Sequence, residues 1–258
     1  MKQKIYQIDA FTTKLFAAVC ILDEWLSNGL MQKIAAENNL AETAFAVKKE
    51  NHYELRWFTP EIEVDLCGHA TLATSFVLYN YYGFQENTLR FISPRSGELL
   101  VQKNDAGLFT MDFPTDDLIP VAEQPDISKA IGKQPLETFK GKTDYMLIYA
   151  TQSDIEAIHP NFHLLNELDC RGVIVSSKGN DVDFVSRFFA PQCGIPEDPV
   201  TGSAHTTLAP YWSKKLGKTY LSAKQLSERG GDLHCQYNGD RVKISGNAVC
   251  YLIGEITL

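Results

Sequence analysis

The chain has 258 residues, which is enough for one large domain or for two domains of ordinary size. Hydrophobic residues make up 44% and charged residues 22%, a balance typical of soluble globular proteins. The net charge is −8 and no cluster of Lys or Arg occurs, so we expect no nucleic-acid partner.

No apolar run approaches the roughly 18 residues that would span a bilayer, so we expect no membrane partner. The opening residues lead into an alternating strand pattern, which differs from the apolar core of a signal peptide. The six cysteines are scattered and form no C-x-x-C pair. We therefore predict reduced thiols and a cytoplasmic location.

The first part of the chain combines alternating strand patterns with two helical stretches. We predict helices over 23–38 and 68–82, and strands over 1–11, 17–22, the second half of 39–47, 53–60, 88–93, 98–103 and 108–113. The stretch 114–120 begins and ends with proline and breaks this pattern. We place a domain boundary there, which gives domains at 1–114 and 115–258, with the last strand of the chain able to pack back on the first domain.

The second part shows shorter helical patterns between buried strands. We predict helical segments over 126–131 (with Asp126 as the cap), 154–159, 162–168 and 202–216, and strands over 145–150, 172–176, 183–191 and within 230–258. Two segments of this half repeat segments of the first. Arg187-Phe188-Phe189-Ala190-Pro191-Gln192 matches Arg56-Trp57-Phe58-Thr59-Pro60-Glu61, and Gly202-Ser203-Ala204 matches Gly68-His69-Ala70.

The repeat predicts an internal duplication, because each Gly-polar-Ala motif leads into an apolar helix that contains Thr-Leu-Ala. Two similar domains would then each present a helix N-terminus toward a shared cleft. Unpaired N–H groups and the positive end of the helix dipole attract a carboxylate. This arrangement favours a small acid as the ligand.

Four motifs, in fixed order, carry a resemblance to a known family: residues 8–12, 39–45, 66–73 and 197–205. They resemble the phenazine-biosynthesis PhzF-like family, which is related to diaminopimelate epimerase. The resemblance implies an α+β fold of two pseudo-symmetric domains, each a strongly curved sheet or barrel wrapped around a central helix. It also implies an active site between the domains, a homodimer, and no metal or organic cofactor.

The resemblance assigns roles to individual residues. Glu42 would be the proton shuttle, while His69, Asp198 and Ser203 would assist proton transfer and hold the substrate. We expect the substrate-binding residues at the two helix starts, namely Gly68, Ala70, Thr201, Gly202 and Ala204. One motif departs from the family: Leu15-Phe16-Ala17-Ala18-Val19 lacks the Gly-Asn-Pro that usually follows the opening strand. This loop is expected to shape the substrate site.

Each of these residues also has a purely structural interpretation. Glu42 follows Asn39 by three positions, as in a capping box, although desolvation among apolar neighbours would suit it to exchange protons with a carbon acid. For His69 we expect the helix N-terminus to favour neutral imidazole, or else a simple contact with a loop. Asp198 could start a turn and Ser203 could cap a helix.

Cys67 falls where epimerase relatives place one of two catalytic thiols, but the repeat puts Thr201 at the matching position. A hydroxyl is too weak an acid for that role, so we expect no diaminopimelate epimerase activity and a packed, structural Cys67. Cys67 and His69 alone would make no zinc site. His205 could line the site or make a local contact.

These observations predict an isomerase that moves a proton on a small carboxylic acid. The first alternative is a non-catalytic protein of the same fold that binds or scaffolds small acids. The second is a serine hydrolase using Ser203, His205 and Asp198, which is weakened by the absence of a G-x-S-x-G elbow and by the spacing of Ser203 and His205 on one helix. A phenazine precursor is the substrate that the family name suggests.

Overall fold

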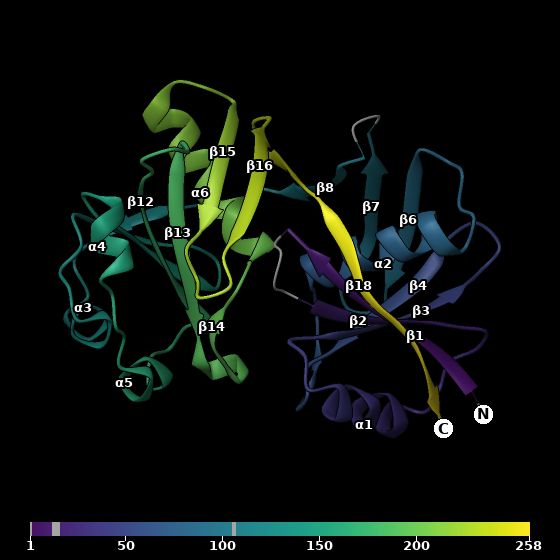
Figure 1. Ribbon diagram of the computed structural model, residues 1–258. Helices are drawn as coiled ribbons and strands as arrows, with labels where there is room; N and C mark the ends of the chain where they lie inside the picture. The colour runs from purple at the N-terminus through teal and green to yellow at the C-terminus, as the bar shows by residue number, and fades with distance from the viewer. Residues whose placement is uncertain (1, 12–15, 105–106) are drawn as a thin grey trace. The chain divides into compact units, whose positions relative to one another are not determined.

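The computed structural model describes residues 2–11, 16–104 and 107–258 (Figure 1). The chain folds into two compact units, one formed by Met1–Asp112 with Ser245–Leu258 and the other by Phe113–Ile244. In the segment that lacks Gly-Asn-Pro, 15–19, Leu15 lies outside the described residues and the other four begin strand β2. Within the described ranges, every helix is too short or too polar to cross a membrane.

The first unit contains two helices and a set of strands from both ends of the chain. Its elements are β1 (Lys2–Ala10), β2 (Phe16–Leu22), α1 (Asn28–Asn38), β3 (Thr43–Lys48), β4 (Tyr53–Phe58), β5 (Glu63–Val64), α2 (Gly68–Tyr81), β6 (Thr88–Ser93), β7 (Gly97–Lys103), β8 (Phe109–Pro114) and β18 (Ala248–Thr257).

The second unit has more short helices. Its elements are β9 (Ile119–Val121), α3 (Pro125–Ile131), β10 (Glu137–Lys140), β11 (Asp144–Ile148), α4 (Gln152–Glu156), α5 (Phe162–Asn166), β12 (Gly172–Lys178), β13 (Phe184–Ala190), a 3-10 turn (Pro191–Cys193), β14 (Ile195–Asp198), α6 (Gly202–Leu216), β15 (Tyr220–Gln225), β16 (Gly231–Tyr237) and β17 (Arg241–Gly246). Asp126 is not the cap of α3, because Pro125 already occupies the first turn and Gln124 is the N-cap.

Both units mix parallel and antiparallel pairs, and the predicted α+β class is confirmed in this respect. In the first unit β2 pairs parallel with β3, β3 antiparallel with β4, β4 parallel with β6, and β6 antiparallel with β7. The same series occurs in the second unit for β11, β12, β13, β15 and β16. A parallel step needs a crossover, and α2 and α6 occupy equivalent crossovers before β6 and β15.

The C-terminal strand belongs to the first unit. β18 pairs antiparallel along the whole of β1, with Lys2 opposite Thr257 and Ala10 opposite Ala248, and Figure 1 shows the two running side by side. The range 115–258 is therefore longer than the second compact unit, which ends at Ile244. The physical reason is that β1 offers the last strand a free row of backbone hydrogen-bonding groups.

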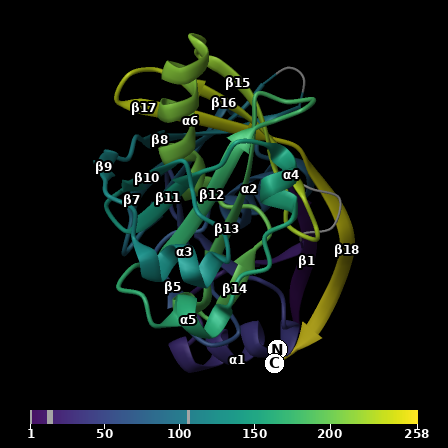
Figure 2. The ribbon, with the colours of Figure 1, turned by 90° about the vertical axis from the view of Figure 1, so that its left-hand side faces the viewer.

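In each unit the central strands are covered on both faces. Val173, Val175, Val185 and Phe189 pack against α3, α4 and α5, which Figure 2 shows beside β12 and β13. Alternate residues face α6: the ring of Phe184 stacks on Trp212, and Trp212 Nε1 donates to Ser176 Oγ over 2.9 Å. Strands buried on both faces read as continuous apolar runs, as β12 does.

The first unit follows the same plan. Residues of β2, β3 and β4, including Cys20, Phe45 and Phe58, pack against Met31 and Ile34 of α1. Helix α2 contacts β1, β2, β3 and β18, and its residues His69–Ser75 are all buried. A helix that is apolar on most of its circumference belongs inside a core. The start of α2 is thereby fixed in place.

Candidate active site

Glu42 lies between helix α1 and strand β3. Asn39 ends α1 as its C-cap, with a left-handed φ of 47° and its N–H bonded to the Ala35 carbonyl over 3.2 Å. The backbone carbonyl of Glu42 then accepts from Ala18 N at 3.0 Å, which ties it to β2. The interpretation of Asn39 and Glu42 as a capping box is therefore wrong, because Asn39 closes a helix instead of opening one.

The structure brings Glu42 and His69 together. The residue Glu42 is 7% exposed and His69 is 3% exposed, so both are cut off from bulk water. Glu42 Oε2 lies 2.8 Å from His69 Nε2, which is ion-pair distance. Among the described residues, this oxygen has no hydrogen-bond partner besides that contact. A buried carboxylate oxygen with a cation beside it can accept a proton from a ligand.

Helix α2 positions the side chain of His69 next to Glu42. Cys67 is the N-cap of α2 in an extended conformation, and its side chain makes no capping hydrogen bond. His69 is the second residue of the helix, directly after Gly68, and so stands in the first helical turn. The prediction that His69 lies at a helix start is confirmed by its position in α2.

The charge of His69 differs from the sequence-based expectation. Burial by itself lowers the pKa of His69, but the negative charges of Cys67 and Glu42 outweigh it and hold this pKa well above 6.5. Because the Cys67 thiol is neutral near pH 7, the carboxylate of Glu42 is the partner that acts there. The expected neutral imidazole is therefore wrong: a carboxylate 2.8 Å away outweighs the helix dipole.

Cys67 completes a buried cluster. Its Sγ lies 3.5 Å from His69 Nδ1. Burial, followed by the charge of Glu42, raises the pKa of the Cys67 thiol to about 11. Potential ligand atoms of Glu42, Cys67 and His69 all lie within 4.8 Å of one another. Zinc accepts these three donor types, so Glu42 adds a donor that the pair Cys67 and His69 lacked. That no metal binds stays a prediction.

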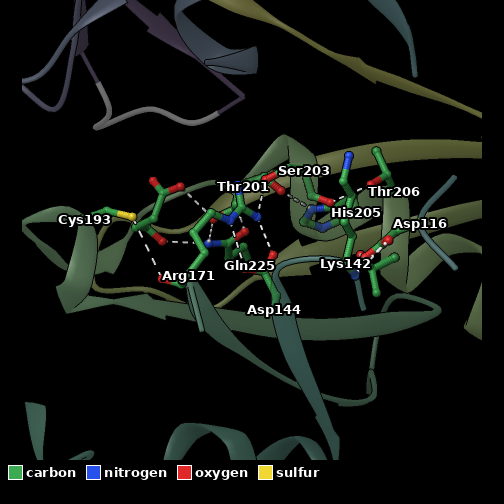
Figure 3. Close-up of polar contacts among 12 residues, drawn as sticks. Asp116, Lys142, Asp144, Arg171, Cys193, Thr201, Ser203, His205, Thr206 and Gln225 are labelled. Atoms are coloured by element: carbon green, nitrogen blue, oxygen red, sulfur yellow. Dashed lines mark hydrogen bonds and ion pairs between the residues drawn. The ribbon is translucent and has the colours of Figure 1, made fainter. Parts of the chain in front are cut away.

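In the second unit, Gln225 organises the loop before α6, as Figure 3 shows. Thr201 N donates to Gln225 Oε1 over 2.8 Å, and Gln225 Nε2 donates to the Asp198 carbonyl over 2.6 Å. Thr201 Oγ1 donates to Asp198 Oδ2 over 2.7 Å. Gln225 is fully buried. It was absent from the sequence analysis, since no local motif links it to this loop.

Ser203 contacts a second residue that the sequence analysis missed. Arg171 Nη2 donates to Ser203 Oγ over 3.0 Å, and Arg171 Nε donates to Asp144 Oδ1 over 2.9 Å. Nη2 also pairs with Asp144 Oδ2, which completes a two-pronged ion pair. Guanidinium has no acceptor, so Ser203 Oγ is the acceptor in its contact with Arg171.

The hydrolase triad is not assembled. His205 is fully buried, and its Nδ1 lies 2.7 Å from the Thr201 carbonyl, to which it donates. Burial lowers the pKa of His205 to about 4. His205 therefore makes the local contact that was one of its two expected roles, and it does not act on Ser203. Nε2 of His205 has no hydrogen-bond partner among the described residues, so neither ring nitrogen contacts Ser203 as a general base would.

The remaining predicted residues lie at the starts of α2 and α6. Ala70 and Ala204 are buried, and Gly202 begins α6 after Thr201, whose side chain does not cap it. Gly68 begins α2 in the same way. The N–H groups of a first helical turn have no intrahelical acceptor. Their use in substrate binding stays a prediction.

The chain is similar in sequence and in structure to known proteins. The family model described as phenazine biosynthesis-like protein matches residues 8–254. A Pseudomonas aeruginosa protein named as an uncharacterized isomerase is 48% identical, and the alignment covers 100% of both chains. A crystal structure of a phenazine biosynthesis protein of the PhzF family from Enterococcus faecalis has a TM-score of 0.95 at 46% identity, again over 100% of both chains.

A more distant structure shares the fold alone. A hydroxyproline epimerase from Agrobacterium vitis has a TM-score of 0.61 at 10% identity, covering 99% of this chain and 91% of that one. The close relatives match over their full length and the family model spans nearly the whole chain. The chain therefore belongs to the phenazine biosynthesis-like (PhzC–PhzF) family.

Proposed function

We propose that the protein is a cofactor-independent isomerase of a small carboxylic acid, with Glu42 as the proton carrier. An isomerase agrees with the name of its relative from P. aeruginosa and with that of a relative from Halalkalibacterium halodurans, which is 41% identical. The observation that carries the proposal is the buried contact of 2.8 Å between Glu42 Oε2 and His69 Nε2.

The proposed reaction has two proton transfers. Glu42, as the carboxylate, takes a proton from a carbon next to a conjugated acid or ketone, and an enolate forms. Glu42, now neutral, returns the proton to a different carbon or to the opposite face, so the proton balance closes. His69 holds Glu42 in place between turnovers through their contact of 2.8 Å. General base catalysis of this kind contributes about 10²- to 10⁴-fold in rate.

The second unit supplies donors and a positioned carboxylate in this proposal. Ser203 donates its hydroxyl hydrogen to the acid, Asp198 assists proton transfer, and Thr201 holds Asp198 through the bond of 2.7 Å. The N–H groups at the starts of α2 and α6 stabilise the charge that builds up on oxygen.

We further propose that the chain arose by internal duplication, with curved sheets around α2 and α6, and that it works as a homodimer. Two features support the duplication. The order of strand pairings is the same in both units. The arginine of each repeated segment also holds a glutamate, since Arg56 Nε donates to Glu63 and Arg187 Nε to Glu197, both over 2.7 Å.

The test is a proton-exchange screen in D₂O. The protein is incubated with a panel of small unsaturated acids and amino acids, and each C–H signal is followed by NMR. We expect deuterium to enter at least one acid with the native protein and with Glu61→Gln, a matched change at an exposed residue. Glu42→Gln should abolish the exchange.

Two outcomes would contradict the proposal. Exchange that persists in Glu42→Gln would remove Glu42 from its role. Absence of exchange across the panel, with some of the same acids raising the melting temperature, would favour the alternative of a non-catalytic protein that binds small acids.

A further inference from the structure

We propose that Arg171 is the specificity-determining residue for the substrate, and that Arg171 and Ser203 together anchor a substrate carboxylate. This inference shares one premise with the proposed function, namely that the ligand is a small carboxylic acid. It assigns the recognition of the acid to a guanidinium that no motif of the sequence singled out. Figure 3 shows Arg171 among Asp144, Ser203 and Gln225.

The position of Arg171 is equivalent to that of Glu42. Glu42 stands immediately before β3 and Arg171 immediately before β12, and each of these strands pairs parallel with the strand before it. His69 and Ser203 are each the second residue of the following buried helix. The side chain before the strand contacts the side chain on the helix in both cases, Glu42 with His69 and Arg171 with Ser203.

The chemistry at the two equivalent positions is opposite. One unit has a carboxylate facing an imidazole, which can move protons near neutral pH. The other has a guanidinium facing a hydroxyl, which cannot exchange protons at that pH but can hold an anion. We infer that the first position carries the proton transfer and the second carries the recognition of the acid.

Arg171 is held in one orientation. Its ion pair with Asp144 uses two nitrogens, and the Asp144 side chain is 4% exposed. The guanidinium carbon also lies 5.4 Å from the centre of the Phe188 ring. Gly172, the next residue, makes room for that ring, because a Cβ there would come within 2.4 Å of it. A pre-organised guanidinium loses little freedom when a ligand binds.

The remaining donors point to a planar anion. Arg171 Nε and Nη2 are occupied by Asp144 and Ser203, while Nη1 has no acceptor among the described residues. The side chain is 36% exposed, so part of it stays accessible. Ser203 already accepts from Arg171, which leaves its own hydrogen for another acceptor. Nη1 and the hydroxyl are then two donors for the two oxygens of a carboxylate.

Charge alone would not attract an acid here. Asp144 neutralises Arg171, and the carboxylate of Asp198 is near enough to act on the same guanidinium. The anchor therefore works through directed hydrogen bonds, not through a net positive field. We expect binding to depend little on ionic strength, in contrast to sites that rely on long-range attraction.

The experiment measures binding in a Glu42→Gln background, where turnover is not required. Calorimetry compares matched pairs of acid and amide: benzoate with benzamide, crotonate with crotonamide, and L-proline with L-prolinamide. We expect at least one acid to bind about tenfold or more tightly than its amide. Ser203→Ala, and Arg171→Gln combined with Asp144→Asn, should remove this preference, whereas Arg229→Gln, at an exposed residue of the same unit, should keep it.

The double variant replaces both charges, so that Asp144 is not left buried without its partner, and Ser203→Ala leaves the ion pair intact. Circular dichroism confirms the fold of each. The anchor is overturned if no acid binds, if acid and amide bind equally, or if the double variant keeps the preference. Lack of deuterium exchange in the native protein would instead overturn the proposed reaction and leave a positive binding result standing.

Discussion

His69 and Glu42 form a buried ion pair, with Nε2 and Oε2 2.8 Å apart. The carboxylate comes from the residue before strand β3 and the imidazole from the start of helix α2, and both elements are packed in the core of the first unit. This pair ties the stability of the unit to pH, because it is favourable only while the imidazole is protonated.

The first prediction concerns stability in alkaline solution. The folded pKa of His69 lies well above 6.5, because the negative charges beside it outweigh burial, and near pH 7 the charged neighbour is the Glu42 carboxylate. The stabilisation by this pair is therefore fully present below pH 6.5 and is lost as the pH rises through the folded pKa. Urea unfolding of the native protein should show that loss. In Glu42→Gln the loss should be much smaller, and an unchanged pH profile in that variant would contradict the assignment.

The second prediction concerns acid. Burial lowers the folded pKa of His205 to about 4, so the unfolded chain binds a proton more readily between pH 6.5 and 4. This group should lower the free energy of unfolding by about 3 kcal/mol as the pH falls through that range. His205→Gln keeps a donor for the Thr201 carbonyl and cannot titrate. Its free energy of unfolding should therefore fall less than that of the native protein over this pH range, by about 3 kcal/mol. Equal acid sensitivity of the two proteins would refute the prediction.

The sequence identified the residues that belong to compact motifs. Glu42, His69, Asp198 and Ser203 belong to such motifs, and the positions of His69 and Ser203 at helix starts follow from a glycine before an apolar run. The short strand that ends at Asp198 is absent from the sequence-based prediction. Whether these four residues act in catalysis stays a prediction.

The partners of these residues could not be identified in this way. Arg171 meets Ser203 only because β12 pairs with β11 and α6 packs against β12 and β13, and Gln225 reaches Thr201 from a later strand. Such contacts depend on tertiary structure and leave no local pattern. Asn39 was misread for a related reason: asparagine suits both a helix N-cap and a left-handed C-cap.

The third prediction tests the two hydrogen bonds by which Gln225 holds the loop before α6. Gln225→Leu leaves the buried Thr201 N–H and Asp198 carbonyl without their partner. An unsatisfied buried polar group costs about 1–3 kcal/mol, and we expect at least that loss in the free energy of unfolding. Gln236→Leu, which removes an exposed bond to Tyr220, should change stability little. Equal losses of unfolding free energy in the two variants would mean that the buried hydrogen bonds of Gln225 contribute no more to stability than an exposed bond.

The fourth prediction concerns the glycine next to Arg171. A Cβ at Gly172 would lie 2.4 Å from the Phe188 ring and 2.9 Å from the Phe189 carbonyl, so Gly172→Ala must displace both. We expect a loss of about 1–3 kcal/mol, as for an overpacked core. Gly29→Ala in α1 meets nothing within 4 Å and should stabilise by about 0.5–1 kcal/mol. Calorimetric melting distinguishes the two, and tolerance of Gly172→Ala would show that the ring can move.

The last prediction concerns the thiol beside the proton carrier. Burial and the charge of Glu42 raise the pKa of Cys67 to about 11, so it is a neutral thiol near pH 7 and cannot serve as a base there. Cys67→Ala should therefore keep deuterium exchange within a few-fold of the native rate, while Glu42→Gln loses it. In the native protein, iodoacetamide at pH 7 should leave Cys67 unmodified in peptide mass analysis. Loss of exchange in a folded Cys67→Ala would instead make the thiol a second proton carrier, and would bring the mechanism closer to a two-base epimerase.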